Sequence, residues 1–123
     1  MKLTKETLNA IKIINFLSKI PTSEIVTADE IAFKEEISYK NCSNILRKLT
    51  LGKIIISFQG VSGGYRLTAD KVTVLDVVNV IQGNIVIFKE NNSFPKNEEP
   101  FSKLKGLENS VKNKFQEIVL YQR

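Results

Sequence analysis

The order of the local signals in the first half of the chain limits the possible folds more than any single motif does. Thr27 and Glu30 have the spacing of a capping box with the threonine as N-cap, which predicts a short helix over 28–34. Ser38 is placed to cap a second helix, 38–51, whose apolar residues recur at helical spacing. Two short helices joined by a tight turn, the second amphipathic and basic, indicate a helix-turn-helix.

A β-hairpin is predicted directly after this pair of helices. Residues 54–58 are rich in isoleucine, residues 60–64 are rich in glycine, and residues 65–67 are suited to a short returning strand. A hairpin in that place is a wing, here 54–67. Because a further helix is expected over 4–19, the whole order is that of a winged helix. The expected fold class is therefore mainly α with a small β-hairpin.

The rest of the sequence predicts two more helices and a loop. A helix is expected over 74–81, and the proline-, asparagine- and glutamate-rich residues after it are typical of a flexible loop. Residues 101–121 are expected to form one long helix with a heptad-like apolar stripe. We divide the chain into a winged-helix domain (1–85), a flexible loop (86–100) and a dimerisation helix (101–123). The stripe is expected to form a dimer interface, with packing inside one chain as the alternative, and consists of Leu104, Leu107, Val111, Phe115 and Ile118.

Composition excludes several classes of protein. The 123 residues contain no histidine and one cysteine, Cys42, so histidine catalysis, histidine metal sites and an intramolecular disulfide are excluded. Cys42 shares the apolar face of helix 38–51, which favours a buried, inert thiol. No apolar run reaches the ~18 residues of a membrane span and no signal-peptide core is found, so we expect a cytoplasmic protein. We expect neither an enzyme nor a bound cofactor or metal.

The excess positive charge lies in one part of the chain. The net charge is +5, and residues 38–72 alone hold six basic residues and one acidic residue. The remaining residues hold 12 of each sign, so all of the excess falls in the segment that contains the second helix and the wing. A local basic patch is typical of a polyanion partner, although a solvated surface face is the simpler alternative.

Several of these segments together resemble the Rrf-two (Rrf2) family of bacterial transcription regulators. The similarity spans about residues 1–85 and continues more loosely beyond them. It implies a homodimer that binds a palindromic operator in double-stranded DNA, with the long C-terminal helix pairing the subunits. The segments that carry it are Ile37-Ser38 and Leu46-Arg47-Lys48-Leu49 in the second helix, Gly63-Gly64-Tyr65-Arg66-Leu67 in the wing, and Thr73-Val74-Leu75-Asp76-Val77 after it.

The sequence also departs from the family pattern. Many members carry three cysteines in the loop before the dimer helix, where they bind an iron–sulfur cluster, but residues 89–100 contain none. The chain is therefore more similar to the cysteine-metabolism repressor of this family than to its iron–sulfur cluster regulator. The Arg-Gly that often begins the wing loop is Gln59-Gly60, and Thr7-Leu8-Asn9 replaces a Gly-Arg-Tyr in the first helix. These changes put the operator sequence in doubt more than the fold.

Together the charge, the pattern and the resemblance predict a DNA-binding transcriptional regulator, most simply a homodimeric repressor. The start of helix 38–51 is expected over base edges in the major groove and its later residues near phosphates. Gly63 and Gly64 either form only a turn or let the backbone approach DNA. The expected DNA-binding residues are Ser38, Tyr39, Lys40, Asn41, Asn44, Arg47 and Lys48 of the helix, and Ser62, Gly63, Gly64, Tyr65 and Arg66 of the wing.

Two questions stay open at this stage. A winged helix can also serve as a protein–protein interaction module without DNA binding, because fold alone does not determine function. The signal is equally open between a small-molecule effector, a regulatory partner protein and a thiol event at Cys42.

Overall fold

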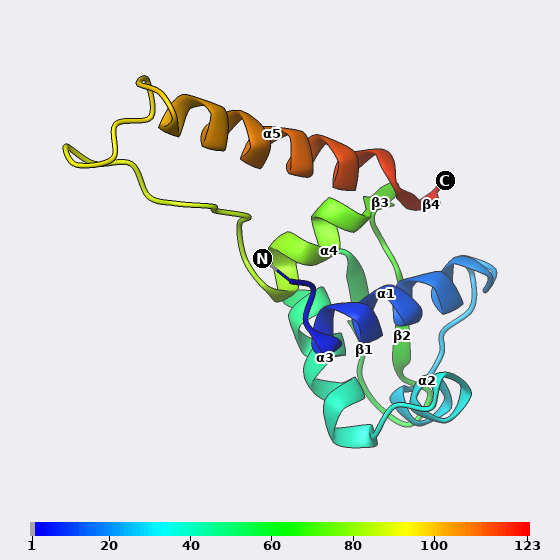
Figure 1. Cartoon of the computed structure of the whole chain (residues 1–123). Helices are drawn as coiled ribbons and strands as arrows, with labels where there is room; N and C mark the ends of the chain where they lie inside the picture. The colour runs from blue at the N-terminus through cyan, green and yellow to red at the C-terminus, as the bar shows by residue number, and fades with distance from the viewer. Residues whose placement is uncertain (1) are drawn as a thin grey trace.

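The computed structural model describes residues 2–123 and has the expected winged-helix order (Figure 1). Its elements are α1 (Lys5–Ser18), α2 (Ala28–Glu35), α3 (Tyr39–Leu51), β1 (Ile55–Phe58), β2 (Gly64–Leu67), β3 (Lys71–Thr73), α4 (Val74–Ile81), α5 (Phe101–Glu117) and β4 (Val119–Gln122). The prediction of a mainly α fold with a small hairpin is confirmed.

The helices begin at the capping residues that the sequence indicates. The hydroxyl of Thr27 accepts a hydrogen bond from the Glu30 amide at 3.2 Å, and the hydroxyl of Ser38 accepts one from the Asn41 amide at 3.2 Å. At α4 both halves of a capping box form, because Thr73 and Asp76 each bond to the other's backbone amide. These caps satisfy amides that have no partner inside their helix.

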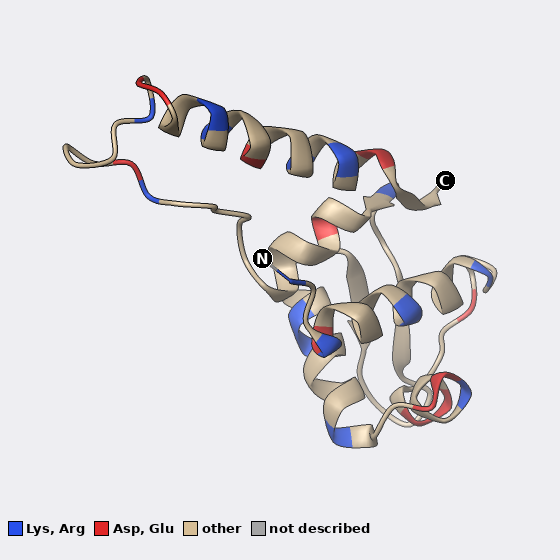
Figure 2. Cartoon of the chain, in the orientation of Figure 1, with Lys and Arg blue, Asp and Glu red and all other residues tan. Residues whose placement is uncertain are grey.

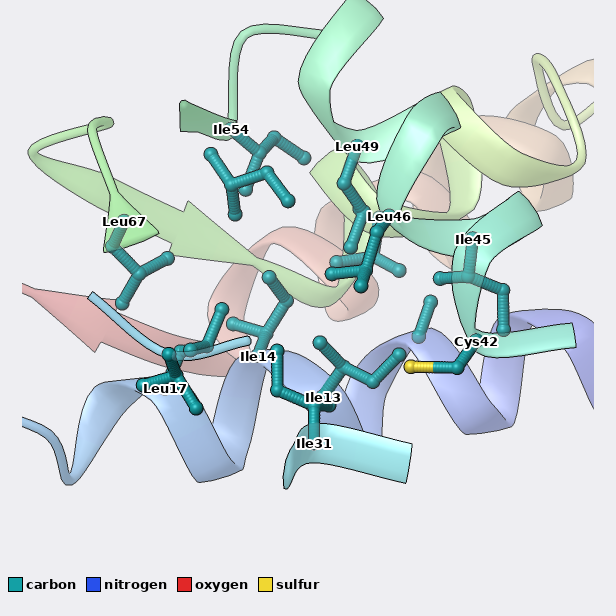
Figure 3. Packing of buried hydrophobic residues seen from close by; sticks show 14 of the residues in the cluster. Ile13, Ile14, Leu17, Ile31, Cys42, Ile45, Leu46, Leu49, Ile54 and Leu67 are labelled. Carbon is teal, nitrogen blue, oxygen red and sulfur yellow. The ribbon is translucent and has the colours of Figure 1, made fainter. Parts of the chain in front are cut away.

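The main core joins α1, α2 and α3 to the base of the wing. Ile13 and Ile14 of α1, Ile31 of α2 and Leu46 of α3 are fully buried in one cluster (Figure 3). Each such side chain contributes roughly 1.5–3 kcal/mol by leaving water. This burial fixes α3 against α1 and leaves its opposite face free.

The wing is an antiparallel pair with a third segment beside it. Ile55 pairs with Leu67 and Phe58 with Gly64. Val26 bridges Tyr65 through two backbone hydrogen bonds of 2.9 and 2.8 Å. The third segment is thus an isolated one-residue bridge against β2.

The expected helix over 101–121 is too long at its C-terminal end. It ends at Glu117, and Val119–Gln122 form β4, which pairs antiparallel with β3. Leu120 and Tyr121 of β4 pack against the core. The apolar spacing continues past Glu117, but the free edge of β3 provides hydrogen bonds for an extended chain and the core accepts its side chains. In Figure 1, α5 lies across α4, and the segment before it projects away from the winged helix.

Candidate nucleic-acid interface

Helix α3 separates its core residues from its polar residues. Cys42, Ile45, Leu46 and Leu49 are buried on one face. The predicted contact residues on the opposite face are exposed, and Tyr39 near the helix start keeps 57% of its surface accessible. The exposed set is Ser38, Tyr39, Lys40, Asn41, Asn44 and Arg47. This arrangement offers amide, hydroxyl and cationic groups along the helix without cost to the core.

Lys48 differs from the other predicted contacts of α3. Its Nζ lies 2.8 Å from Oε1 of Glu6 in α1, and both side chains are partly buried. The ion pair links two helices and neutralises one of the six basic residues counted between positions 38 and 72. Sequence reasoning missed Glu6, because no local pattern connects residues 42 positions apart.

The wing loop turns tightly at its glycines. Gly60 has a φ of +96°, and the amide of Gly63 donates to its carbonyl at 3.0 Å. A Cβ at Gly63 would lie 2.1 Å from the Phe58 carbonyl oxygen, so only glycine fits there. Ser62 is exposed at the loop.

Gly64 has an internal reason to be glycine. It is buried, and a Cβ there would lie 2.4 Å from Cγ2 of Ile25 and 2.7 Å from the carbonyl oxygen of Val26. Close contact with residues 25–26 therefore accounts for this glycine without any approach to DNA. Tyr65, its neighbour, is half-buried and packs against the core.

Arg66 points back along the protein surface. Its Nη1 donates to the carbonyl oxygen of Thr22 at 3.1 Å, and its guanidinium carbon lies 5.2 Å from the centre of the Phe58 ring. Phe58 belongs to the predicted hairpin, but no local pattern connects Arg66 with Thr22, 44 residues earlier.

Charge is unevenly distributed over the helix-turn-helix. Figure 2 shows basic positions at both ends of α3 and mostly acidic positions on α2. Helix α2 contains Asp29, Glu30 and Glu35 against Lys34 alone. The contrast makes α3, and not α2, the element suited to a polyanion.

The predicted dimer residues fall into two groups. Leu104, Leu107 and Ile118 are exposed, Leu107 by 53%. Val111 and Phe115 instead pack, partly buried, against a second cluster of the same chain formed by Val74, Val78 and Ile85. Part of the predicted stripe thus packs inside the chain, and Ile118 lies just past the end of α5 at Glu117.

Polar contacts of Glu108 and Lys105, which the sequence did not indicate, hold residues 87–90 of the loop against α5. Glu108 is only 5% exposed and accepts the Ile87 amide at 2.7 Å. Nζ of Lys105 donates to the Phe88 carbonyl at 2.9 Å and lies 3.0 Å from Oε2 of Glu90. The hydrogen bond from Ile87 and the nearby Lys105 hold the pKa of Glu108 below its ordinary value, against the opposing effect of burial.

Comparison with known proteins decides the family. The family model described as "Iron-dependent Transcriptional regulator", Rrf2, matches residues 3–122. The chain belongs to the Rrf2 family. It is 32% identical over 84 residues to BadM of Rhodopseudomonas palustris, which is named as an HTH-type transcriptional regulator. That match covers 67% of this chain and about half, 53%, of BadM.

Solved structures show the same Rrf2 fold. CymR, the global cysteine regulator of B. subtilis, superposes with a TM-score of 0.79 at 20% identity, covering 98% of this chain and 93% of CymR. IscR of T. potens superposes with a TM-score of 0.73 at 18% identity, covering 98% of this chain and 83% of IscR. Among residues 2–123, no helix has the length and apolar character needed to span a membrane.

The residues of this Rrf2 protein do not fit an iron–sulfur cluster. The loop 89–100 contains no cysteine or histidine. Cys42 is fully buried, and its Sγ donates to the Ala28 carbonyl at 3.8 Å. Burial raises the pKa of this thiol to about 11, so it is protonated at neutral pH. The single cysteine is consistent with the expected resemblance to the cysteine regulator of this family.

Proposed function

We propose that this Rrf2 protein is a sequence-specific DNA-binding repressor that acts as a homodimer on a palindromic operator in the cytoplasm. The observation that carries the proposal is the exposed polar and basic face of α3, which lies opposite the core and precedes a wing. Lys40, Asn41 and Asn44 are the residues for base edges, since amide and ammonium groups suit adenine and guanine in the major groove. Arg47 is a residue for phosphate, where it displaces counterions.

The second copy of the chain is proposed to contact the exposed apolar residues of α5. Leu104 and Leu107 are exposed on the helix and Ile118 just past its end, and leucines at this spacing suit a helix–helix seam. A two-fold axis through this contact would present two copies of α3 to two half-sites.

The proposal is tested by selecting genomic DNA fragments that bind the purified protein and titrating the selected duplex against salt. Arg47→Ala is expected to weaken binding to the selected and to a random duplex alike, and to lower the salt slope by about one ion. Lys114→Ala removes the same charge from α5, far along the chain from α3, and is expected to leave the slope unchanged. No enriched fragment, or equal effects of the two variants, would contradict the proposal.

A protein-interaction module is the second candidate function. Phe33 on α2 is 81% exposed beside acidic residues, a surface that suits a basic protein better than DNA. This candidate gains support if the selection enriches no DNA.

A further inference from the structure

We infer that Arg66 is a positioning residue of the wing, which braces the hairpin against the α1–α2 connection instead of binding a DNA phosphate. The expected effect of Arg66 on DNA affinity rests on the proposed function, whereas the contacts that brace the wing do not. The positive charge of Arg66 alone would suggest a phosphate contact instead.

The first support is that the guanidinium group makes two contacts inside the protein, one through a nitrogen and one through its face. Nη1 donates to the Thr22 carbonyl at 3.1 Å, so one part of the group is bound to the segment that follows α1. The planar group also lies over the Phe58 ring, 5.2 Å from its centre. Phe58 is a diagonal cross-strand neighbour, because Arg66 pairs with Ile56 two residues earlier on β1.

The second support is the continuity of contacts along β2. Gly64 lies against Ile25 and Val26 so closely that no Cβ fits, and Tyr65 bridges Val26 through two hydrogen bonds. Arg66 adds Thr22 to this series. Three successive residues of β2 are therefore held by the chain between α1 and α2, and the exposed loop at 59–62 extends from a fixed base.

The chemistry of arginine explains why this residue suits the position. A planar guanidinium group can stack on an aromatic face while its edge donates a hydrogen bond, whereas the ammonium group of lysine has no plane to stack. A phosphate contact is less demanding, because lysine also binds phosphate as a point charge. Arginine and lysine variants therefore separate the two roles.

The DNA measurement compares Arg66→Ala, Arg66→Lys and Phe58→Leu with Arg47→Ala on the selected duplex. If Arg66 braces the wing, all three wing variants weaken binding by about fivefold, and the salt slope stays at the wild-type value. Arg47→Ala lowers the slope by about one ion. A slope lowered equally by Arg66→Ala, with binding restored by Arg66→Lys and unaffected by Phe58→Leu, would overturn the inference.

A measurement on the protein without DNA tests the bracing role of Arg66 separately from the proposed DNA binding. Hydrogen exchange of the Val26 and Tyr65 amides is expected to be faster in Arg66→Ala and Phe58→Leu, while the buried amides of α1 stay as protected as in the wild type. Unchanged exchange at Val26 and Tyr65 would refute the bracing role. A wild-type protein that selects no DNA would instead refute the proposed function and leave this exchange result standing.

Discussion

Glu6 of α1 and Lys48 of α3 form an ion pair between helices, with Oε1 and Nζ 2.8 Å apart. The pair places a carboxylate beside the C-terminal part of the proposed recognition helix. The negative charge of this carboxylate repels a DNA phosphate. It also pairs with Lys48, which would otherwise be available to bind a phosphate.

Replacement of Glu6 by glutamine is expected to tighten DNA binding and to steepen its salt dependence by up to about one ion, because Lys48 is released. The free energy of unfolding is expected to change by less than about 1 kcal/mol, as is usual for partly exposed ion pairs. Salt titrations and denaturant unfolding measure the two effects. The control is Glu6→Gln combined with Lys48→Ala, in which the gain must disappear; a gain that persists would show that Lys48 is not its source.

Lys40→Ala is expected to relax sequence specificity as well as affinity. The exposed side chain lies in the first turn of α3, where base contacts are made, and a base contact there contributes about 1–3 kcal/mol of discrimination at one position. Affinities for the selected duplex and its single-base variants measure this loss. A uniform loss over all duplexes would assign Lys40 to phosphate.

Leu104→Glu with Leu107→Glu is expected to give folded monomers. Both side chains are exposed on α5, so the charges disturb a contact between copies but not the core of one copy. Light scattering gives the mass, and circular dichroism reports the fold.

The matched control is Val111→Glu on the same helix. Val111 packs on the chain's own second cluster, so this change is expected to destabilise the fold by about 1.5 kcal/mol or more. A wild type that is already monomeric would rule out the dimer.

Stability near the loop is expected to fall in acid through Glu108. The pKa of Glu108 is lowered in the folded chain, so its charge stabilises the fold above the ordinary value of 4.5 and this contribution is lost as the pH falls from there through the folded pKa. Hydrogen exchange of the Ile87 amide should therefore accelerate in acid, after correction for intrinsic rates.

Glu108→Gln keeps an acceptor for this amide but cannot titrate, so its corrected exchange should depend less on pH. Glu117→Gln, an exposed change on the same helix, should behave as the wild type. Equal pH dependence in the wild type and Glu108→Gln would show that another group is responsible.

The thiol of Cys42 is expected to resist alkylation in the native protein. Burial blocks access and raises its pKa to about 11, so almost no thiolate is present at neutral pH. Mass spectrometry after iodoacetamide treatment should find modification only when denaturant is added. Rapid labelling of Cys42 in the native protein would instead support a thiol event at this residue as the signal that the regulator senses.

The parts of the fold that sequence predicted are those controlled by local chemistry. Thr27, Ser38 and Thr73 cap helices because their hydroxyls reach amides only three residues away. The apolar face of α3 could also be predicted, because the helical period of its apolar residues places the same side chains inward. The candidate DNA-binding face consists of the remaining residues of that helix.

The parts that sequence missed depend on contacts between distant segments. Val119–Gln122 continue an apolar pattern compatible with a helix, and only the free edge of β3 makes them a strand. The partners of Lys48 and Arg66 likewise come from other elements, and both contacts change the expected role of a basic residue. Positive charge in a sequence does not distinguish a free cation from one already engaged.

The return of the chain through β4 has a consequence for the spacing of DNA half-sites. Helix α5 is held at two places: Glu108 in its middle accepts the Ile87 amide of the segment after α4, and β4 just past its C-terminal end pairs with β3. Rotation of α5 would have to break one of these attachments, so a dimer joined through α5 holds its two copies of α3 at a fixed distance and phase. One base pair inserted between the half-sites shifts the second by about 3.4 Å and turns it by about 35° around the duplex. A dimer with a fixed distance between its two α3 helices cannot adjust to that shift. The length of the spacer between the half-sites therefore contributes to operator recognition together with the base sequence.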